Sequence, residues 1–246
     1  MPPKSHIAVP TLFTSLNIFC GFTAVVLIVS ANFIGAVWLI FIAAIFDGLD
    51  GRIARAVAGS SDFGMYMDSL GDVVSAGLAP ALLVYQFHLS NYGHVGLMVA
   101  FAPLLFSAFR LARYNLSVQM DGRKNDFIGL PAPMAAVNLC SVVLLHLETG
   151  WDFLLRFLLV LIPAVSLLMV STIRYPGFPR FSFREGGRNR IRLVLFCAFW
   201  LTLPVTPHYG MFFFMMIYLL SGPVIFFRER NADIKLIGEQ SRDAAL

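Results

Sequence analysis

Apolar segments of about twenty residues follow one another along almost the whole chain, with short polar stretches between them. A helix of that length spans the hydrocarbon core of a bilayer. Hydrophobic residues make up 58% of the 246 residues and charged residues 13%, a composition that excludes a soluble globular domain. The sequence therefore predicts an all-α fold, a polytopic bundle of transmembrane helices.

The hydropathy pattern predicts about eight spans and at least six. The windows are 11–31, 33–58, 63–89, 94–119, 131–150, 153–173, 191–206 and 209–227. The last two are the weakest, because Pro204 and Pro207 shorten the seventh window and Pro223 interrupts the eighth. We expect a membrane domain over 1–228 and a polar cytoplasmic tail over 229–246.

Cationic residues lie on one side of this predicted topology. With the N-terminus in the cytoplasm, all 18 Lys and Arg residues except Arg156 fall at or near the cytoplasmic face. An even number of spans returns the C-terminus to the same side. Because no organelle signal is apparent, we expect a prokaryotic cytoplasmic membrane. The net charge of +4 follows from this topology and also suits anionic membrane lipids.

Aspartates interrupt the apolar pattern of the second span. The apolar run 33–46 is too short to cross the bilayer, so its helix must continue through Asp47 and Asp50 toward residue 58. A charge inside a membrane helix is costly and is by default a functional candidate. The stretch Gly-Ser-Ser-Asp at 59–62 predicts a turn and the cap of a returning helix.

On the returning helix Asp68 and Asp72 are four residues apart and therefore share one face. Two carboxylate pairs can meet across the resulting hairpin. Without a cation they would repel one another and be driven toward protonation. All-oxygen ligands favour Mg²⁺ or Mn²⁺, two ions per site, with Ca²⁺ as an alternative occupant.

Small residues accompany these aspartates, and they leave a patch of bare backbone. Gly51 and Ala54 lie near Asp47 on one helix, and Gly64 lies on the other. Such a patch either lets a neighbouring helix approach closely or admits a nucleotide. With Arg55 available for a phosphate, we favour the nucleotide.

Residues 47–72 resemble the signature of the CDP-alcohol phosphatidyltransferase family. The pattern is Asp-x2-Asp-Gly-x2-Ala-Arg followed, after the spacer 56–63, by Gly-x3-Asp-x3-Asp, and every position matches. The resemblance implies a membrane enzyme that moves a phosphatidyl group from CDP-diacylglycerol to an alcohol and releases CMP. It also implies a homodimer.

The resemblance also assigns roles to the matching positions. Metal ligands would be Asp47, Asp50, Asp68 and Asp72, and Asp72 would also be the general base on the acceptor hydroxyl. CDP would be bound through Asp47, Gly51, Ala54, Arg55 and Gly64. Spacing alone does not identify the base.

The acceptor is suggested by two further segments that are similar to membrane-integral phosphatidylserine synthases. One segment contains Arg110, Arg113 and Asn115, and the other, 125–133, opens with Asn125 and Asp126. The opening segment 10–21 is similar to the same group. A mixed lining of this kind suits L-serine, which carries a carboxylate and an ammonium, as well as the lipid phosphate. Plain snorkelling of the arginines to the interface is the competing interpretation.

Several alternatives stay open at this point. Glycerol phosphate, inositol phosphate and choline are other acceptors for the same chemistry. A divalent-cation or proton-coupled transporter would also carry intramembrane aspartates, but no inverted repeat is visible and the acidic residues are confined to one hairpin. No nucleic-acid partner is expected.

Overall fold

The described part of the chain is built from helices. The computed structural model describes residues 5–56, 62–121, 128–175, 194, 202 and 205–243. The elements are α1 (Ser5–Val29), α2 (Phe33–Ala56), α3 (Asp62–Asp72), the π-helix η1 (Val73–Leu78), α4 (Ala79–Phe87), the 3₁₀-helix η2 (Leu89–Tyr92), α5 (Gly93–Asp121), α6 (Ala132–Thr149), α7 (Phe153–Val170) and α9 (Pro207–Asp243). An isolated β-bridge joins Ile128 to Arg174.

Seven segments of the described residues are long and apolar enough to cross a membrane. They are Leu12–Val29, Phe33–Asp50, Phe63–Phe87, Leu89–Ser117, Ala132–Thr149, Phe153–Val170 and Pro207–Arg228. These correspond to seven of the eight predicted windows and confirm the polytopic helical bundle. The remaining window, 191–206, lies largely outside the described residues.

The outer surface of the bundle is strongly apolar. Side chains such as Phe19, Phe22, Met98 and Val160 are at least 60% exposed. Exposed apolar area on this scale is unfavourable in water and suits contact with lipid chains. The protein is therefore an integral membrane protein.

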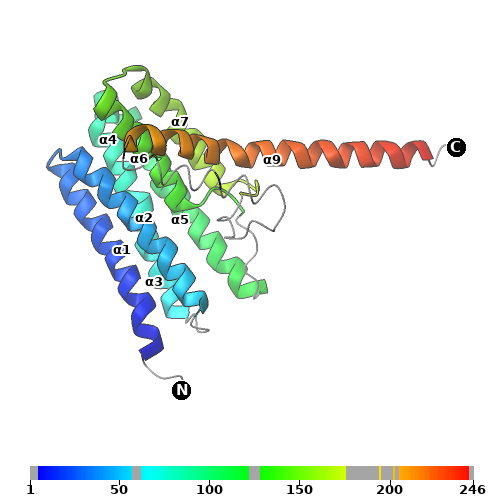
Figure 1. Cartoon of the computed structure of the whole chain (residues 1–246), viewed down its shortest axis with the longest axis horizontal. Coiled ribbons are helices and arrows are strands. Elements are labelled where there is room, and N and C mark those ends of the chain that lie inside the picture. Colours follow the sequence, from blue (N-terminus) through cyan, green and yellow to red (C-terminus); the bar gives the residue numbers. More distant parts are fainter. Residues whose placement is uncertain are drawn as a thin grey trace.

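The spans from α1 to α5 run in alternating directions along the bundle (Figure 1). Figure 1 shows the N-terminal end of α1, the α2–α3 hairpin and the C-terminal end of α5 at the same end of the bundle. The predicted hairpin is confirmed in outline, since α2 ends at Ala56 and α3 begins at Asp62. Its connection, 57–61, lies outside the described residues.

The third span, predicted as the window 63–89, contains a π-helical turn. Directly after Asp72 the helix passes through η1 before α4 begins. Two glycines bring η1 close to its neighbours: a Cβ on Gly21 of α1 would lie 2.8 Å from Ser75 Cα, and a Cβ on Gly77 would lie 2.6 Å from Ser107 Oγ. A π-turn inside a helix often marks a functional site.

The last described helix, α9, packs on α6 and then projects away from the bundle (Figure 1). The expectation that Pro223 interrupts this span is wrong, because α9 runs through Pro223 without a break. Proline removes the hydrogen bond to the carbonyl of Leu219, and the Tyr175 hydroxyl donates to that oxygen instead, at 3.3 Å. The helix also passes the predicted boundary at residue 228 in helical conformation.

Candidate metal and substrate site

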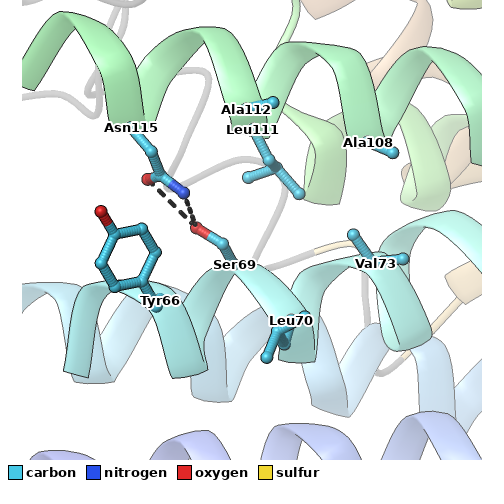
Figure 2. A pocket seen from close by; sticks show the side chains of 8 residues that line it. All are labelled: Tyr66, Ser69, Leu70, Val73, Ala108, Leu111, Ala112 and Asn115. Atoms are coloured by element: carbon cyan, nitrogen blue, oxygen red, sulfur yellow. Dashed lines mark hydrogen bonds between the residues drawn. The ribbon is translucent and has the colours of Figure 1, made fainter. Parts of the chain in front are cut away.

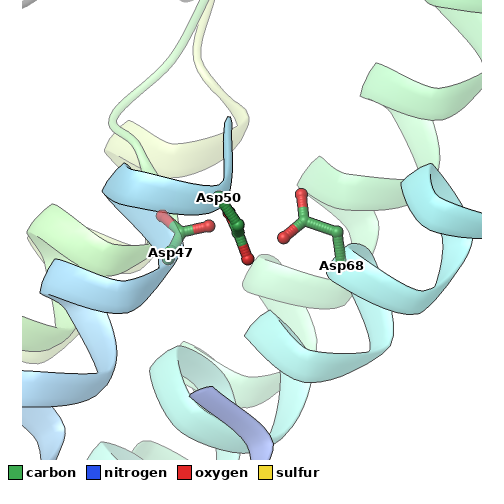
Figure 3. A group of neighbouring side chains, drawn as sticks. All are labelled: Asp47, Asp50 and Asp68. Atoms are coloured by element: carbon green, nitrogen blue, oxygen red, sulfur yellow. The ribbon is translucent and has the colours of Figure 1, made fainter. Parts of the chain in front are cut away.

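Three aspartates of the signature meet between α2 and α3. Asp47 and Asp50 of α2 and Asp68 of α3 each offer one carboxylate oxygen within 4.8 Å of the others. Figure 3 shows the three side chains pointing toward one another from the two helices. Asp50 is only 3% exposed, and the other two are half-buried.

Asp72 lies one turn farther along α3 and is also buried, with 6% exposure. Asp47 and Asp68 repel its carboxylate, whereas Arg110 attracts it. The fourth aspartate is therefore within electrostatic reach of the cluster, although it does not belong to the group of three that converge on one point.

Helix α1 adds two polar side chains to these carboxylates. Thr14 Oγ1 donates to Asp50 Oδ2 at 3.1 Å, and Asn17 Nδ2 donates to Asp72 Oδ1 at 3.3 Å. Sequence reasoning assigned no role to either residue. The available signal was their spacing, since a Thr and an Asn three apart share one face of a predominantly apolar helix.

Arg110 of α5 is a buried cation within electrostatic reach of the aspartates. It is 8% exposed and is attracted by Asp72 and Asp47. Its Nε has no hydrogen-bond partner among the described residues. A buried cation beside carboxylates, with a donor to spare, can bind an anionic ligand group.

Arg113, one turn farther along α5, is differently placed. It is exposed, and its guanidinium donates to the Val170 carbonyl at 2.8 Å and to the Ser171 carbonyl at 3.4 Å. Because the last carbonyls of a helix lack partners within it, this arginine caps the C-terminus of α7. The two predicted arginines thus differ, since Arg110 interacts electrostatically with the aspartates and Arg113 caps a helix.

Asn115 is also away from the aspartates. It exchanges hydrogen bonds with Ser69 of α3 at 3.0 and 3.3 Å. The pair lines a shallow, mainly apolar pocket of about 260 Å³ between α3 and α5, with Tyr66 and Leu70 at its edge (Figure 2). On α3, Tyr66 and Leu70 are each two positions from Asp68, so they lie on the opposite side of the helix from that aspartate.

The predicted nucleotide positions are described only in part. Gly51, Ala54 and Arg55 belong to α2, but their side chains lie outside the described set, and Gly64 is half-buried in α3. The other predicted acceptor residues, Asn125 and Asp126, lie outside the described residues.

The donor set fits a divalent cation. Three carboxylate oxygens converge, two of the carboxylates come from one helix and one from its partner in the hairpin, and every donor is a hard oxygen. Such a group would be electrostatically unfavourable in a membrane without a compensating positive charge.

The sequence profile of the CDP-alcohol phosphatidyltransferase family matches residues 7–173. A CDP-diacylglycerol--serine O-phosphatidyltransferase of Helicobacter pylori is 36% identical over 227 residues, covering 90% of this chain and 92% of that protein. A protein of the same name from Methanocaldococcus jannaschii is 33% identical over 229 residues, covering 92% and 97%. An archaetidylserine synthase of Methanothermobacter thermautotrophicus is 38% identical over 175 residues, covering 70% and 71%.

The matched region contains the complete signature and, except for the first two residues of α1, every described helix from α1 to α7. Proteins of this family generally depend on a divalent metal, which agrees with the converging carboxylates. The chain belongs to the CDP-alcohol phosphatidyltransferase family.

Proposed function

We propose that this protein transfers the phosphatidyl group of CDP-diacylglycerol to the hydroxyl of L-serine, giving phosphatidylserine and CMP. The observation that carries the proposal is the convergence of Asp47, Asp50 and Asp68 within a complete family signature. Serine as the acceptor is supported by the names of the relatives in Helicobacter pylori and Methanocaldococcus jannaschii, which match nearly the whole chain.

Asp47, Asp50 and Asp68 would hold the divalent ions, with Asp72 contributing to the same site. When bound, Mg²⁺ or Mn²⁺ supplies positive charge that stabilises the pyrophosphate and the departing CMP. Gly51, Ala54 and Gly64 would leave room for the cytidine nucleotide, Asp47 would contact it, and Arg55 would bind its phosphates. This division follows the positions of the family signature.

Asp72 is the proposed general base. The serine hydroxyl oxygen bonds to the phosphorus of the phosphatidyl group, the bond from that phosphorus to the CMP oxygen breaks, and the hydroxyl proton passes to the Asp72 carboxylate. The buried position of Asp72 next to the three converging aspartates suits this role.

Arg110 would bind the lipid phosphate or the serine carboxylate. Its burial, its attraction to Asp72 and Asp47, and its spare Nε donor support this assignment. Asn125 and Asp126 remain proposed acceptor residues on the basis of the sequence. For Arg113 and Asn115 a supporting role is favoured, because their polar groups are used within the protein.

The proposal includes a prokaryotic cytoplasmic membrane with the site facing the cytoplasm. The α2–α3 hairpin and the C-terminal end of α5 lie at the end of the bundle where the positive-inside rule puts the cytoplasm (Figure 1). A homodimer is proposed from the family resemblance, and light scattering of the detergent-solubilised protein would test it.

The test is release of CMP by the purified protein from CDP-diacylglycerol with Mn²⁺ or Mg²⁺. The acceptors are L-serine, glycerol phosphate, inositol phosphate and choline, and a chelator serves as the control. We expect release with L-serine alone and none after chelation. CMP release with a different acceptor would reject serine as the acceptor but not the phosphatidyl transfer. If folded protein releases no CMP with any of the four acceptors, the transferase proposal is rejected.

A further inference from the structure

Helix α1 brings a buried threonine and a buried asparagine to the aspartate site. Thr14 is 4% exposed and Asn17 is fully buried. They are hydrogen-bonded to carboxylates of two different helices, Asp50 of α2 and Asp72 of α3. Buried polar groups cost free energy unless they are hydrogen-bonded, so their place in an apolar helix requires a reason.

Close helix packing makes these contacts possible. A Cβ on Gly71 of α3 would lie 3.2 Å from Ile18 Cγ1 and 3.5 Å from Asn17 Nδ2 of α1. One turn farther, Gly21 of α1 packs against the backbone of Ser75. Because small residues let the helices approach, short polar side chains on α1 can reach the carboxylates.

The two ends of the Asn17 amide are used differently. Its Nδ2 donates to Asp72, whereas its Oδ1 is buried with no hydrogen-bond partner among the residues that the structure describes. An unsatisfied buried acceptor costs about 1–3 kcal/mol, and the hydrogen bond from Nδ2 offsets part of that cost. The hydrogen bond that the structure gives this amide is the one to Asp72.

We propose that Asn17 and Thr14 are positioning residues for the transfer reaction. Asn17 holds Oδ1 of Asp72, which fixes the orientation of the carboxylate that takes the proton of the acceptor hydroxyl. Thr14 holds Oδ2 of Asp50, which turns the other oxygen of that carboxylate toward Asp47 and Asp68. The proposal rests on the proposed function, in which Asp72 is the base and the other three aspartates bind metal.

The first experiment separates kcat from KM. Partners that orient a metal ligand or a catalytic group are typically worth 10- to 100-fold. In Asn17→Ala we expect kcat to fall about 10- to 100-fold, with the KM values for CDP-diacylglycerol and L-serine changed less than about threefold. A kcat within twofold of the wild-type value would overturn the role of Asn17.

Asn138 provides the matched control. It is also a buried asparagine of a membrane span, donates through Nδ2 to the Met215 carbonyl at 3.0 Å, and has an Oδ1 without a partner in the described part of the chain. Asn138→Ala should lower the unfolding temperature in detergent to a similar degree but keep kcat within twofold. An equal loss of kcat in both variants would show that the loss comes from disturbed helix packing, and would reject the positioning role of Asn17.

A second variant covers the case in which Asn17→Ala does not yield folded protein. Asn17→Asp keeps the shape of the side chain but removes the amide donor, so kcat should again fall at least tenfold. A wild-type kcat in Asn17→Asp would reject the proposal.

Thr14 is tested by a measurement that does not depend on turnover. Binding of Mn²⁺ alone is followed by electron paramagnetic resonance in Thr14→Val and Thr14→Ser. We expect about 10- to 100-fold weaker binding in Thr14→Val and near wild-type binding in Thr14→Ser, which keeps the hydroxyl donor. Equal affinities in both variants would reject the role of Thr14.

These outcomes distinguish this proposal from the proposed function. If the wild-type protein releases CMP with an acceptor other than L-serine, the Asn17 variants are compared with that acceptor. If it releases none, the transferase proposal and the role of Asn17 fail together, while the Mn²⁺ measurement still decides the role of Thr14.

Discussion

Asp50 and Asp72 are almost completely buried in a protein whose exterior is apolar. Two further carboxylates, Asp47 and Asp68, lie beside them, and like charges gathered in a membrane repel one another strongly. Arg110 and the donors Thr14 and Asn17 offset part of this repulsion from α5 and α1. At the scale of single residues, the site gathers negative charge, which a divalent cation would stabilise.

Replacement of Asp72 by Asn tests its proposed role as base. The amide keeps the size of the side chain but cannot take a proton at neutral pH, so we expect turnover to fall at least 100-fold. Binding of a CDP-lipid, measured by isothermal titration with Mn²⁺ present, should change little. Normal turnover in Asp72→Asn would show that another group takes the proton.

Arg113 can be separated from Arg110 by its effect on stability. Because Arg113 donates to carbonyls at the end of α7, Arg113→Ala should lower stability by about 1–2 kcal/mol with little change in the KM for serine. Arg110→Ala should instead raise the KM for serine or CDP-diacylglycerol by tenfold or more. A large rise in the serine KM of Arg113→Ala, without loss of stability, would show that Arg113 contributes to the acceptor site.

The helices α1, α3 and η1 are held together by close backbone contacts rather than by large side chains. Of the glycines involved, Gly21 has the tightest contact that is made to backbone, at 2.8 Å to Ser75 Cα. Such contacts set the distance between α1 and the aspartates. At the scale of elements, the site depends on how closely these helices approach.

Gly21→Ala should therefore separate α1 from η1. Overpacking of this kind typically costs about 1–3 kcal/mol, measured as a lower unfolding temperature in detergent. Gly48→Ala is the control, because a Cβ on Gly48 of α2 would meet nothing within 4 Å and alanine favours the helix. Equal stability of the two variants would contradict the importance of the Gly21 contact.

The hydroxyl of Tyr175 forms a hydrogen bond to α9, at the carbonyl of Leu219. Burial raises the pKa of this hydroxyl to about 12, so it remains a donor at neutral pH. Tyr175→Phe should cost about 0.6–1 kcal/mol, because the carbonyl of Leu219 then lacks a donor.

A double-mutant cycle tests the reason for this contact. In Pro223→Ala the backbone N–H of residue 223 is restored and can donate to Leu219, so Tyr175→Phe should cost less in that background. The unfolding temperatures of the four proteins give the coupling. Additive effects would show that the proline does not explain the hydrogen bond.

For the whole molecule, a bound divalent ion should link α2 to α3 and stabilise the bundle. At 100 times its dissociation constant, a ligand specific to the folded state adds about 2.7 kcal/mol. Mn²⁺ should therefore raise the unfolding temperature, measured by scanning fluorimetry in detergent, and a chelator should reverse the rise. The same rise in a variant with Asn at positions 47, 50 and 68 would place the stabilising ion elsewhere.

The sequence by itself determined the membrane fold class, the seven spans that the structure describes and the family. Apolar segment length and the signature are local properties of the chain. It also placed Asp47, Asp50 and Asp68 on facing helices. The tertiary structure alone decided that Arg110 lies within electrostatic reach of the aspartates while Arg113 caps α7, since two positions one turn apart share a face and differ only in what packs on them. It also decided that Tyr175 donates to α9 near Pro223 and that α1 supplies Thr14 and Asn17 to the aspartates. Each of these hydrogen bonds joins residues 36 to 55 positions apart in the chain. Nothing in the local sequence specifies which helices meet at such distances.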